Sequence, residues 1–237
     1  MIEISSGRMN IALIIGTLRG GGAERILSAM ANYWDDRGHK VTLMTHDARE
    51  QDFYPLGPGI DRIGLNLTGP TRGPLHTSRQ RVLKISEPRS IIRRLNPDVA
   101  ISFTAMTNCE TIIALSGTGI PLIVSERNNP TAQKLSAFWR LMRMALYPRA
   151  SALVMQTDES AAWARKIVDG TRVHTIPNFV EPPSGHGENI SPGIPRTGHL
   201  ITAAGRLTYQ KGFDLLIEAF SRAGEDRTDW SLVILGE

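Results

Sequence analysis

The chain of 237 residues contains a single cysteine, Cys109, and no apolar run long enough to cross a membrane. One cysteine excludes a disulfide within the chain, which is typical of proteins from a reducing compartment. The longest apolar run near the N-terminus, at 11–15, is too short for the core of a secretory signal peptide. We therefore expect a cytoplasmic protein.

Metal and nucleic-acid signatures are also lacking. The six histidines are scattered without the spacing of a metal site, so no metal is expected. Neither a zinc-finger spacing nor an RNA-recognition motif is present, so we expect no nucleic-acid partner, although a net charge of +4 would permit one. Residues 1–182 hold 22 Lys/Arg and 16 Asp/Glu, against 5 and 7 in residues 183–237. A basic first part predicts a phosphate-bearing ligand or an anionic membrane surface.

What the sequence does contain is an alternation of short apolar runs with helical patterns. The predicted strands lie at 10–16, 40–47, 99–103, 121–125 and 151–157. Continuous apolar runs of this length are typical of buried parallel strands. Residues from about 51 to 80 are rich in Gly and Pro and are predicted to be irregular. The pattern predicts an α/β protein with a Rossmann-like parallel sheet.

The composition changes at "EPPSGHGENISPGIPRTG" (181–198), which is rich in Pro, Gly and Ser and is typical of a linker. A new strand–turn–helix–strand pattern follows it. We predict four parts, which are a leader at 1–8, a Rossmann-like domain at 9–182, a linker at 183–197 and the beginning of a second, incomplete Rossmann-like domain at 198–237. The roughly 40 residues of the last part are too few to enclose a core of their own.

The first candidate site is the loop "GTLRGGGAER" (16–25), which contains Gly20, Gly21 and Gly22 between a predicted strand and helix. Backbone N–H groups of such a loop can approach an anion. The spacing fits neither a dinucleotide fingerprint, because Arg25 takes the place of the third glycine, nor a P-loop. A tight turn without a ligand is the alternative. Asp47 resembles the ribose-binding acid of a dinucleotide fold, but without that spacing we favour a capping role.

The second candidate site is the turn "GRLTYQKG" (205–212). Arg206 can present a planar fork of donors to phosphate oxygens, and Lys211 supplies a mobile point charge. Gly205 and Gly212 allow close approach at the carboxyl end of a strand, where ligands of open α/β sheets bind. The turn would suit a diphosphate, and a solvated basic loop is the alternative.

Together these motifs resemble glycosyltransferase family 4. The stretch "GRLTYQKGFDLLIEAF" (205–220), followed by "LVILGE", is similar to the start of the family's nucleotide-binding domain. The strand, glycine-rich loop and helix at 9–47 resemble the family's opening. "VSERNNP" (124–130) and "VHTIPNFV" (173–180) are also similar and occur in the expected order. The resemblance runs from about residue 9 to the end of the chain.

The resemblance implies a GT-B architecture, with an active site in the cleft between two Rossmann-like domains. It implies retaining transfer of a sugar from a nucleotide-diphosphate sugar to a polysaccharide or lipid-linked glycan, without a cofactor or an obligatory metal. Arg206, Lys211 and Gly205 would hold the donor diphosphate, and the glycine loop would face the phosphates and the acceptor. The family's paired glutamates would lie beyond residue 237. We therefore assign no catalytic residue and expect the 237-residue chain alone to be inactive or nearly so.

Glu126, Arg127 and Asn128 stand at the end of a predicted strand, within "VSERNNP". Charged and amide groups at such a position, in a domain of this resemblance, are predicted to contact the acceptor or the donor sugar. The alternative is a salt-bridged turn before Pro130.

Two stretches, at 78–94 and 137–149, combine Lys and Arg with apolar residues. Basic and aromatic residues on one helix predict binding to an anionic membrane surface, here the inner face of the cell membrane. A solvated helix face and a core-packing helix are the alternatives. Two other functions also remain open, which are a non-catalytic acceptor- or membrane-binding module and a nucleotide-dependent dehydrogenase. The glycine spacing disfavours the dehydrogenase.

Overall fold

The computed structural model describes residues 7–68, 74–180, 198–223 and 229–236. The chain divides into two compact units, Met1–Val180 and Glu181–Glu237. The predicted linker at 183–197 lies outside the described residues, as do the first six residues of the predicted leader.

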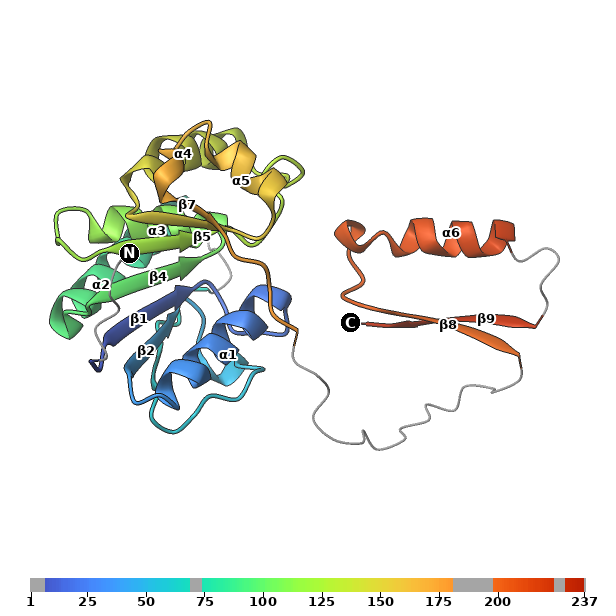
Figure 1. Ribbon diagram of the computed structural model, residues 1–237, viewed down its shortest axis with the longest axis horizontal. Helices are drawn as coiled ribbons and strands as arrows, with labels where there is room; N and C mark the ends of the chain where they lie inside the picture. Colours follow the sequence, from blue (N-terminus) through green and yellow to red (C-terminus); the bar gives the residue numbers. More distant parts are fainter. Residues whose placement is uncertain (1–6, 69–73, 181–197, 224–228, 237) are drawn as a thin grey trace. The chain divides into compact units, whose positions relative to one another are not determined.

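Seven parallel strands form the sheet of the first unit, in the order β3-β2-β1-β4-β5-β6-β7 (Figure 1). They are β1 (Asn10–Ile15), β2 (Lys40–Thr45), β3 (Asp61–Gly64), β4 (Val99–Phe103), β5 (Leu122–Ser125), β6 (Ala152–Met155) and β7 (Val173–Thr175). The strand order reverses between β1 and β4, so this is the switch point of a doubly wound sheet. The predicted Rossmann-like α/β class is confirmed.

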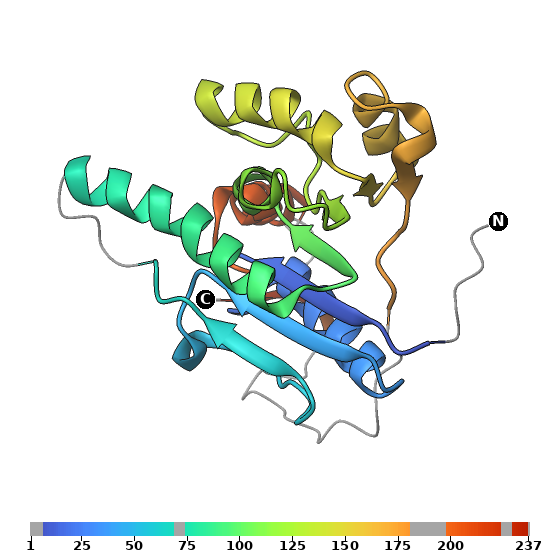
Figure 2. The ribbon, with the colours of Figure 1, turned by 90° about the vertical axis from the view of Figure 1, so that its left-hand side faces the viewer.

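Helices cover both faces of this sheet. The helices of the first unit are α1 (Gly22–Asp35), η1 (Arg49–Gln51), α2 (Pro74–Leu95), α3 (Ala105–Leu115), α4 (Ala137–Leu146), η2 (Tyr147–Arg149), α5 (Asp158–Ala164) and η3 (Gly170–Arg172). In Figure 2 the blue α1 lies on one side of the strands, and the teal α2 and green α3 lie on the other. This arrangement follows from right-handed crossovers that leave the switch point in opposite directions.

The central strand β1 shows why its sequence is continuously apolar. Ile14 belongs to a buried cluster that includes Cys109 of α3, whereas Leu13 belongs to a second cluster with Leu27 of α1. Successive side chains of a strand point to opposite faces, so a strand covered on both sides needs apolar residues throughout. Desolvation raises the pKa of the Cys109 thiol to about 12, so this cysteine is a packed, protonated side chain.

The prediction of an irregular region from about 51 to 80 is wrong in two places. Strand β3 occupies Asp61–Gly64, and helix α2 begins at Pro74. The strand gives a weak sequence pattern because it has only four residues, lies at the sheet edge and begins with two charged side chains. Arg62 is nevertheless buried, since its guanidinium is paired with Asp52.

The second unit contains β8 (His199–Ala204), η4 (Tyr209–Lys211), α6 (Phe213–Ala223) and β9 (Trp230–Leu235). Its two strands pair in parallel along their whole length. The strand–turn–helix–strand pattern predicted from the sequence is confirmed as a βαβ unit. Its turn is tightly packed, because a methyl group at Gly236 would lie 2.0 Å from the Gly205 carbonyl oxygen.

Candidate functional site

Polar groups gather at the carboxyl edge of the first unit's sheet, next to the switch point. A methyl group at Gly16, which follows β1, would lie 3.4 Å from Thr107 Oγ1 in the first turn of α3. The loop after β1 therefore lies beside the start of α3, the helix that follows β4. Between β4 and α3, Thr104 has a φ of 75°, which costs a β-branched residue roughly 1–3 kcal/mol. Ligands of open α/β sheets bind at this position, so this edge is the candidate site.

The glycine loop does not need its glycines for backbone geometry. Gly20, Gly21 and Gly22 are not among the residues with a left-handed φ. A methyl group at Gly22 would meet no described atom within 4 Å, and one at Gly20 would make only ordinary contacts with the Phe53 ring. Glycine at positions 20 and 22 would instead allow the backbone to approach a ligand closely.

We predict that Gly22→Ala separates folding from binding. Alanine is the better helix former at the first position of α1, so the midpoint of thermal unfolding should stay the same or rise. The added methyl group should instead occupy space that the bound ligand needs. The resulting steric overlap should raise KM by about tenfold or more. The two effects are measured by calorimetry and by steady-state kinetics.

The matched control is Gly64→Ala at the end of β3. A methyl group there would lie 2.8 Å from the Arg49 backbone nitrogen, so this variant should lose about 1–3 kcal/mol of unfolding free energy. If Gly22→Ala keeps the wild-type KM, the glycine loop does not approach a ligand.

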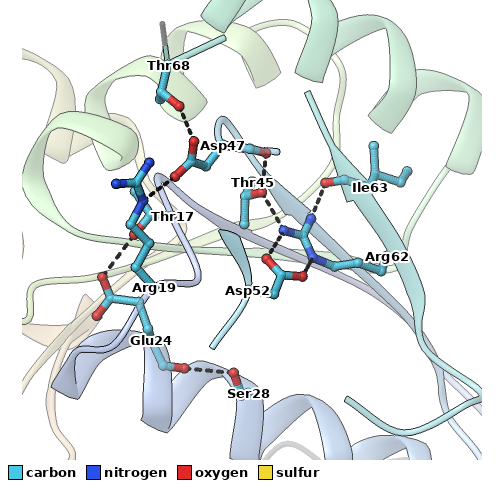
Figure 3. Close-up of polar contacts among 10 residues, drawn as sticks. All are labelled: Thr17, Arg19, Glu24, Ser28, Thr45, Asp47, Asp52, Arg62, Ile63 and Thr68. Carbon is cyan, nitrogen blue, oxygen red and sulfur yellow. Dashed lines mark hydrogen bonds and ion pairs between the residues drawn. The ribbon is translucent and has the colours of Figure 1, made fainter. Parts of the chain in front are cut away.

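Two side chains hold the glycine loop in shape. The Tyr54 hydroxyl accepts a hydrogen bond from the Gly21 N–H (3.1 Å) and donates one to the Gly21 carbonyl (2.9 Å). On the other side, the Thr17 hydroxyl donates to Glu24 Oε1 (3.3 Å), as Figure 3 shows. The Glu24 carboxylate would be only 2.3 Å from a methyl group at Gly21, so this glycine leaves room for Glu24. The loop is thus preorganised before any ligand arrives.

Asp47 follows β2 and binds Arg19, an arginine of the glycine loop (Figure 3). Its buried carboxylate accepts a hydrogen bond from Arg19 Nε (2.7 Å) and another from the Thr68 hydroxyl. Burial raises the pKa of Asp47, but these hydrogen bonds outweigh it and the pKa falls below its usual value. The predicted capping role is wrong, because the residue that precedes η1 as its N-cap is Ala48 and no side chain caps this helix. Asp47 instead fixes Arg19, which stays 57% exposed.

The side chain of Glu126 is buried in the interior of the first unit. The Tyr147 hydroxyl donates to Glu126 Oε2 (2.5 Å), and Arg143 Nη1 lies 3.9 Å from the same oxygen. Asn108 Nδ2 donates to the Tyr147 hydroxyl (3.2 Å), so the cluster joins α3, η2 and the end of β5. Desolvation raises the pKa of Glu126 to about 7, although Tyr147 and Arg143 act in the opposite direction. With only 1% of its surface exposed, Glu126 supports the loop from inside.

Arg127 and Asn128 stay nearer the surface and are half-buried. The Arg127 guanidinium lies 4.5 Å from the centre of the Phe103 ring, and its Nη2 donates to Asn178 Oδ1. This hydrogen bond joins "VSERNNP" to "VHTIPNFV", two motifs that the sequence alone leaves separate. Burial lowers the pKa of Arg127 to about 10, so the side chain remains a cation at neutral pH. Within the described residues its Nε has no hydrogen-bond acceptor, which suits an anionic or hydroxyl ligand.

A buried pair beneath this edge was not predicted from the sequence. His46 Nδ1 lies 3.5 Å from Glu110 Oε2, and both side chains are buried. Desolvation, with a smaller contribution from the Lys84 charge, lowers the pKa of His46 to about 4. The imidazole is therefore neutral at physiological pH, in keeping with the structural role expected for the histidines.

In the second unit, the turn after β8 brings Gly205 and Lys211 together. A methyl group at Gly205 would lie 3.5 Å from Cδ and Cε of Lys211, so the lysine stem passes over this glycine. Gly212, with a φ of 64°, takes the left-handed conformation that ends η4 before α6 begins. Arg206 and Lys211 are exposed, and neither forms an ion pair with the described residues. Two uncompensated cations therefore lie on one turn.

A doubly wound parallel sheet followed by a βαβ unit matches the order of elements in α/β proteins of the GT-B class, and the structure resembles solved proteins of that class. The structure is similar to sucrose-phosphate synthase from Thermosynechococcus elongatus, with a TM-score of 0.77 and 14% identity, over 97% of this chain and 62% of that one. It is also similar to Anabaena HepE in complex with UDP-glucose, with a TM-score of 0.66 and 14% identity, over 96% and 60% of the two chains.

The family profile described as Glycosyltransferase Family 4 matches residues 20–183, which is more than half of the chain, and the protein belongs to this family. The chain is 29% identical over 231 residues to a Campylobacter jejuni enzyme, GalNAc-α-(1→4)-GalNAc-α-(1→3)-diNAcBac-PP-undecaprenol α-1,4-N-acetyl-D-galactosaminyltransferase. It is 21% identical over 231 residues to the amylovoran biosynthesis glycosyltransferase AmsD of Erwinia amylovora. The alignments cover 97% and 96% of this chain, which spans 62% and 61% of the lengths of these relatives. The resemblance read from the motifs is confirmed.

Proposed function

We propose that the protein is a glycosyltransferase, which transfers a sugar from a nucleotide-diphosphate sugar to a lipid-linked glycan with retention of configuration. Membership in Glycosyltransferase Family 4 supports the reaction class. The name of the Campylobacter jejuni relative describes an acceptor on diphospho-undecaprenol, and HepE binds UDP-glucose. A non-catalytic module is not favoured, because the Campylobacter jejuni and Erwinia amylovora relatives are both named as transferases.

The observation that carries the proposal is the pair of uncompensated cations on the turn at 205–212. Sugar transfer breaks the bond between the anomeric carbon and a phosphate oxygen, so negative charge builds up on the departing diphosphate. Arg206 can donate two parallel hydrogen bonds to this group, and Lys211 adds a mobile positive charge. Gly205 lets the lysine stem lie close to the turn that carries Arg206, so both charges are supplied by one short segment.

On the acceptor side, we assign binding to the carboxyl edge of the first unit's sheet. Gly20 and Gly22 offer backbone at close range, and Arg127 and Asn128 offer donors and an acceptor. Glu126 holds the loop that carries them. The nucleotide sugar is the donor substrate, and we propose that no cofactor or metal takes part.

The test is transfer of a labelled sugar from UDP- and GDP-linked donors to a polyprenyl-diphosphate glycan, in the presence of EDTA. The protein should turn over and should give the retained anomer by NMR. Absence of transfer from every donor, or an inverted product, would contradict the proposal.

We further propose that α4 contacts an anionic membrane surface that carries the acceptor. Trp139 and Met142 pack against the core, as the core-packing alternative requires. Phe138, Leu141 and Met144 do not, and they form an exposed apolar stripe on the helix. None of the described helices is long and apolar enough to span a bilayer.

The basic stretch at 78–94 contributes less to such a surface than its charge suggests. Arg89 of α2 donates to the carbonyl oxygens of Ala114 (2.6 Å) and Ser116 (2.8 Å), so it binds the C-terminal end of α3. Lys84 is half-buried. Part of the positive charge of this helix is therefore structural.

We predict that Phe138→Glu lowers the fraction of protein that floats with anionic liposomes by about tenfold or more, since a charge replaces an apolar contact. The matched control is Tyr33→Glu on α1, because Tyr33 and Phe138 are both 52% exposed. Flotation that does not depend on anionic lipid, or that falls equally in both variants, would remove α4 from the membrane interface.

A further inference from the structure

An aromatic ring lies on the glycine loop and is not accounted for by the core. Phe53 is 68% exposed, in the segment that follows η1. Its ring atoms would be 3.8–3.9 Å from a methyl group at Gly20, so the side chain packs beside the loop without entering the interior. Large apolar side chains exposed to this extent contribute little to stability. A role outside the core is therefore the better explanation.

The backbone on both sides of this ring is firmly anchored. The Phe53 N–H donates to the Leu18 carbonyl (2.9 Å), which ties the segment to the glycine loop. The preceding residue, Asp52, receives two hydrogen bonds from the buried Arg62, at 2.7 and 2.6 Å (Figure 3). A two-bond Arg–carboxylate pair fixes direction as well as distance. The exposed ring is thus attached to a rigid base.

Tyr54 fixes the orientation of the ring. The Phe53 and Tyr54 rings meet edge to face, with centroids 5.1 Å apart and planes at 78°. Tyr54 itself is held by its two hydrogen bonds with Gly21. An ion pair, a backbone hydrogen bond and an aromatic contact therefore all position one side chain that faces solvent.

We propose that Phe53 is the stacking platform for one pyranose ring of the acceptor glycan. Pyranoses present one face of C–H groups, which packs against the negative face of an aromatic ring, while their hydroxyl groups remain at the edge. Polar partners for these hydroxyls are available on the same loop, where Arg19 is exposed and held by Asp47. A platform that is rigid before binding loses little freedom when the sugar arrives.

This inference rests on the proposed function, and it adds the residue that selects a flat sugar face. It predicts a preference for pyranoses whose C–H face is unobstructed, because an axial hydroxyl on that face would lift the ring from Phe53. The flat aromatic shape, and not apolar bulk alone, should be what matters.

The test is saturation-transfer NMR on the 237-residue chain with soluble trisaccharides of hexose and N-acetylhexosamine units. Phe53→Ala and Phe53→Leu should each weaken glycan binding by about 3- to 10-fold, and Phe53→Tyr should retain it. Tyr33→Ala is the matched control, since Tyr33 is also an exposed aromatic residue, at 52%, but lies on α1. Thermal unfolding of each variant checks that the fold is intact.

Binding that survives in Phe53→Leu, or that falls equally in Tyr33→Ala, would overturn the stacking role. Failure of every trisaccharide to bind the wild-type chain would overturn it as well. UDP binding, measured in the same samples, reports on the proposed function. If the chain binds UDP but its glycan binding does not depend on Phe53, only the stacking role is wrong. If the chain binds neither UDP nor any glycan, the proposed function is contradicted as well.

Discussion

Replacing Arg206 or Lys211 with alanine lowers the rate constant of sugar transfer by about 10²–10³-fold, as removal of one preorganised donor to a developing anion does in other enzymes. The acceptor KM should change little, because the two cations are assigned to the donor diphosphate. Arg206→Lys should recover only part of the rate, since an ammonium cannot form the two-bond fork of a guanidinium. Steady-state kinetics of the wild type and the variants measure these effects.

The matched control is Arg222→Ala, which removes an exposed arginine of α6 in the same unit. Arg222 is paired with Glu218 one helical turn away, at 2.5 Å, so its charge is already compensated. This variant should keep the wild-type rate within about twofold, because exposed pairs of this kind contribute little. Equal losses in Arg206→Ala and Arg222→Ala would mean that general positive charge, and not the turn, matters.

Neutralising Glu126 removes a pH-dependent part of the folding free energy. The folded state holds the Glu126 proton up to about pH 7, whereas the unfolded chain releases it near 4.5. Stability from this group is therefore complete below pH 4.5 and is lost as the pH rises toward 7, by on the order of 3 kcal/mol. Glu126→Gln is permanently neutral, and its side-chain oxygen can still accept a hydrogen bond from the Tyr147 hydroxyl. Its unfolding free energy should therefore fall less than that of the wild type as the pH rises over this range.

The measurement is urea unfolding of wild type and Glu126→Gln at several pH values between 4 and 8. The difference in unfolding free energy should grow in favour of glutamine as the pH rises. Glu50→Gln, at an exposed position in η1, is the control and should run parallel to wild type. Parallel curves for wild type and Glu126→Gln would show that the buried carboxyl does not titrate in this range.

The regular part of the fold could be predicted because its residues repeat with the periods of strands and helices. The apolar run at 10–16 gives β1, and the pattern after Gly205 gives α6, without knowledge of tertiary contacts. Strand β3 could not be found in this way. Its Arg62 is buried through an ion pair with Asp52, and such a partner is visible only after folding.

The candidate site was predicted where a motif is contiguous and missed where it is assembled from distant segments. The glycine loop and the turn at 205–212 are single stretches of sequence. Phe53 and Tyr54, by contrast, reach Gly20 and Gly21 across more than 30 residues, and nothing in their own segment marks them. Glu126 was predicted to contact the acceptor or the donor sugar, but its side chain is buried and accepts a hydrogen bond from the Tyr147 hydroxyl, a partner that is visible only after folding.

The most direct test of the sugar-transfer proposal is a UDP titration of the isotope-labelled chain, followed by amide NMR. The proposal predicts that chemical-shift changes concentrate on residues 205–212 and that Arg206→Ala abolishes them at the same UDP concentration. Saturable changes confined to other residues, or unchanged binding in Arg206→Ala, would contradict it.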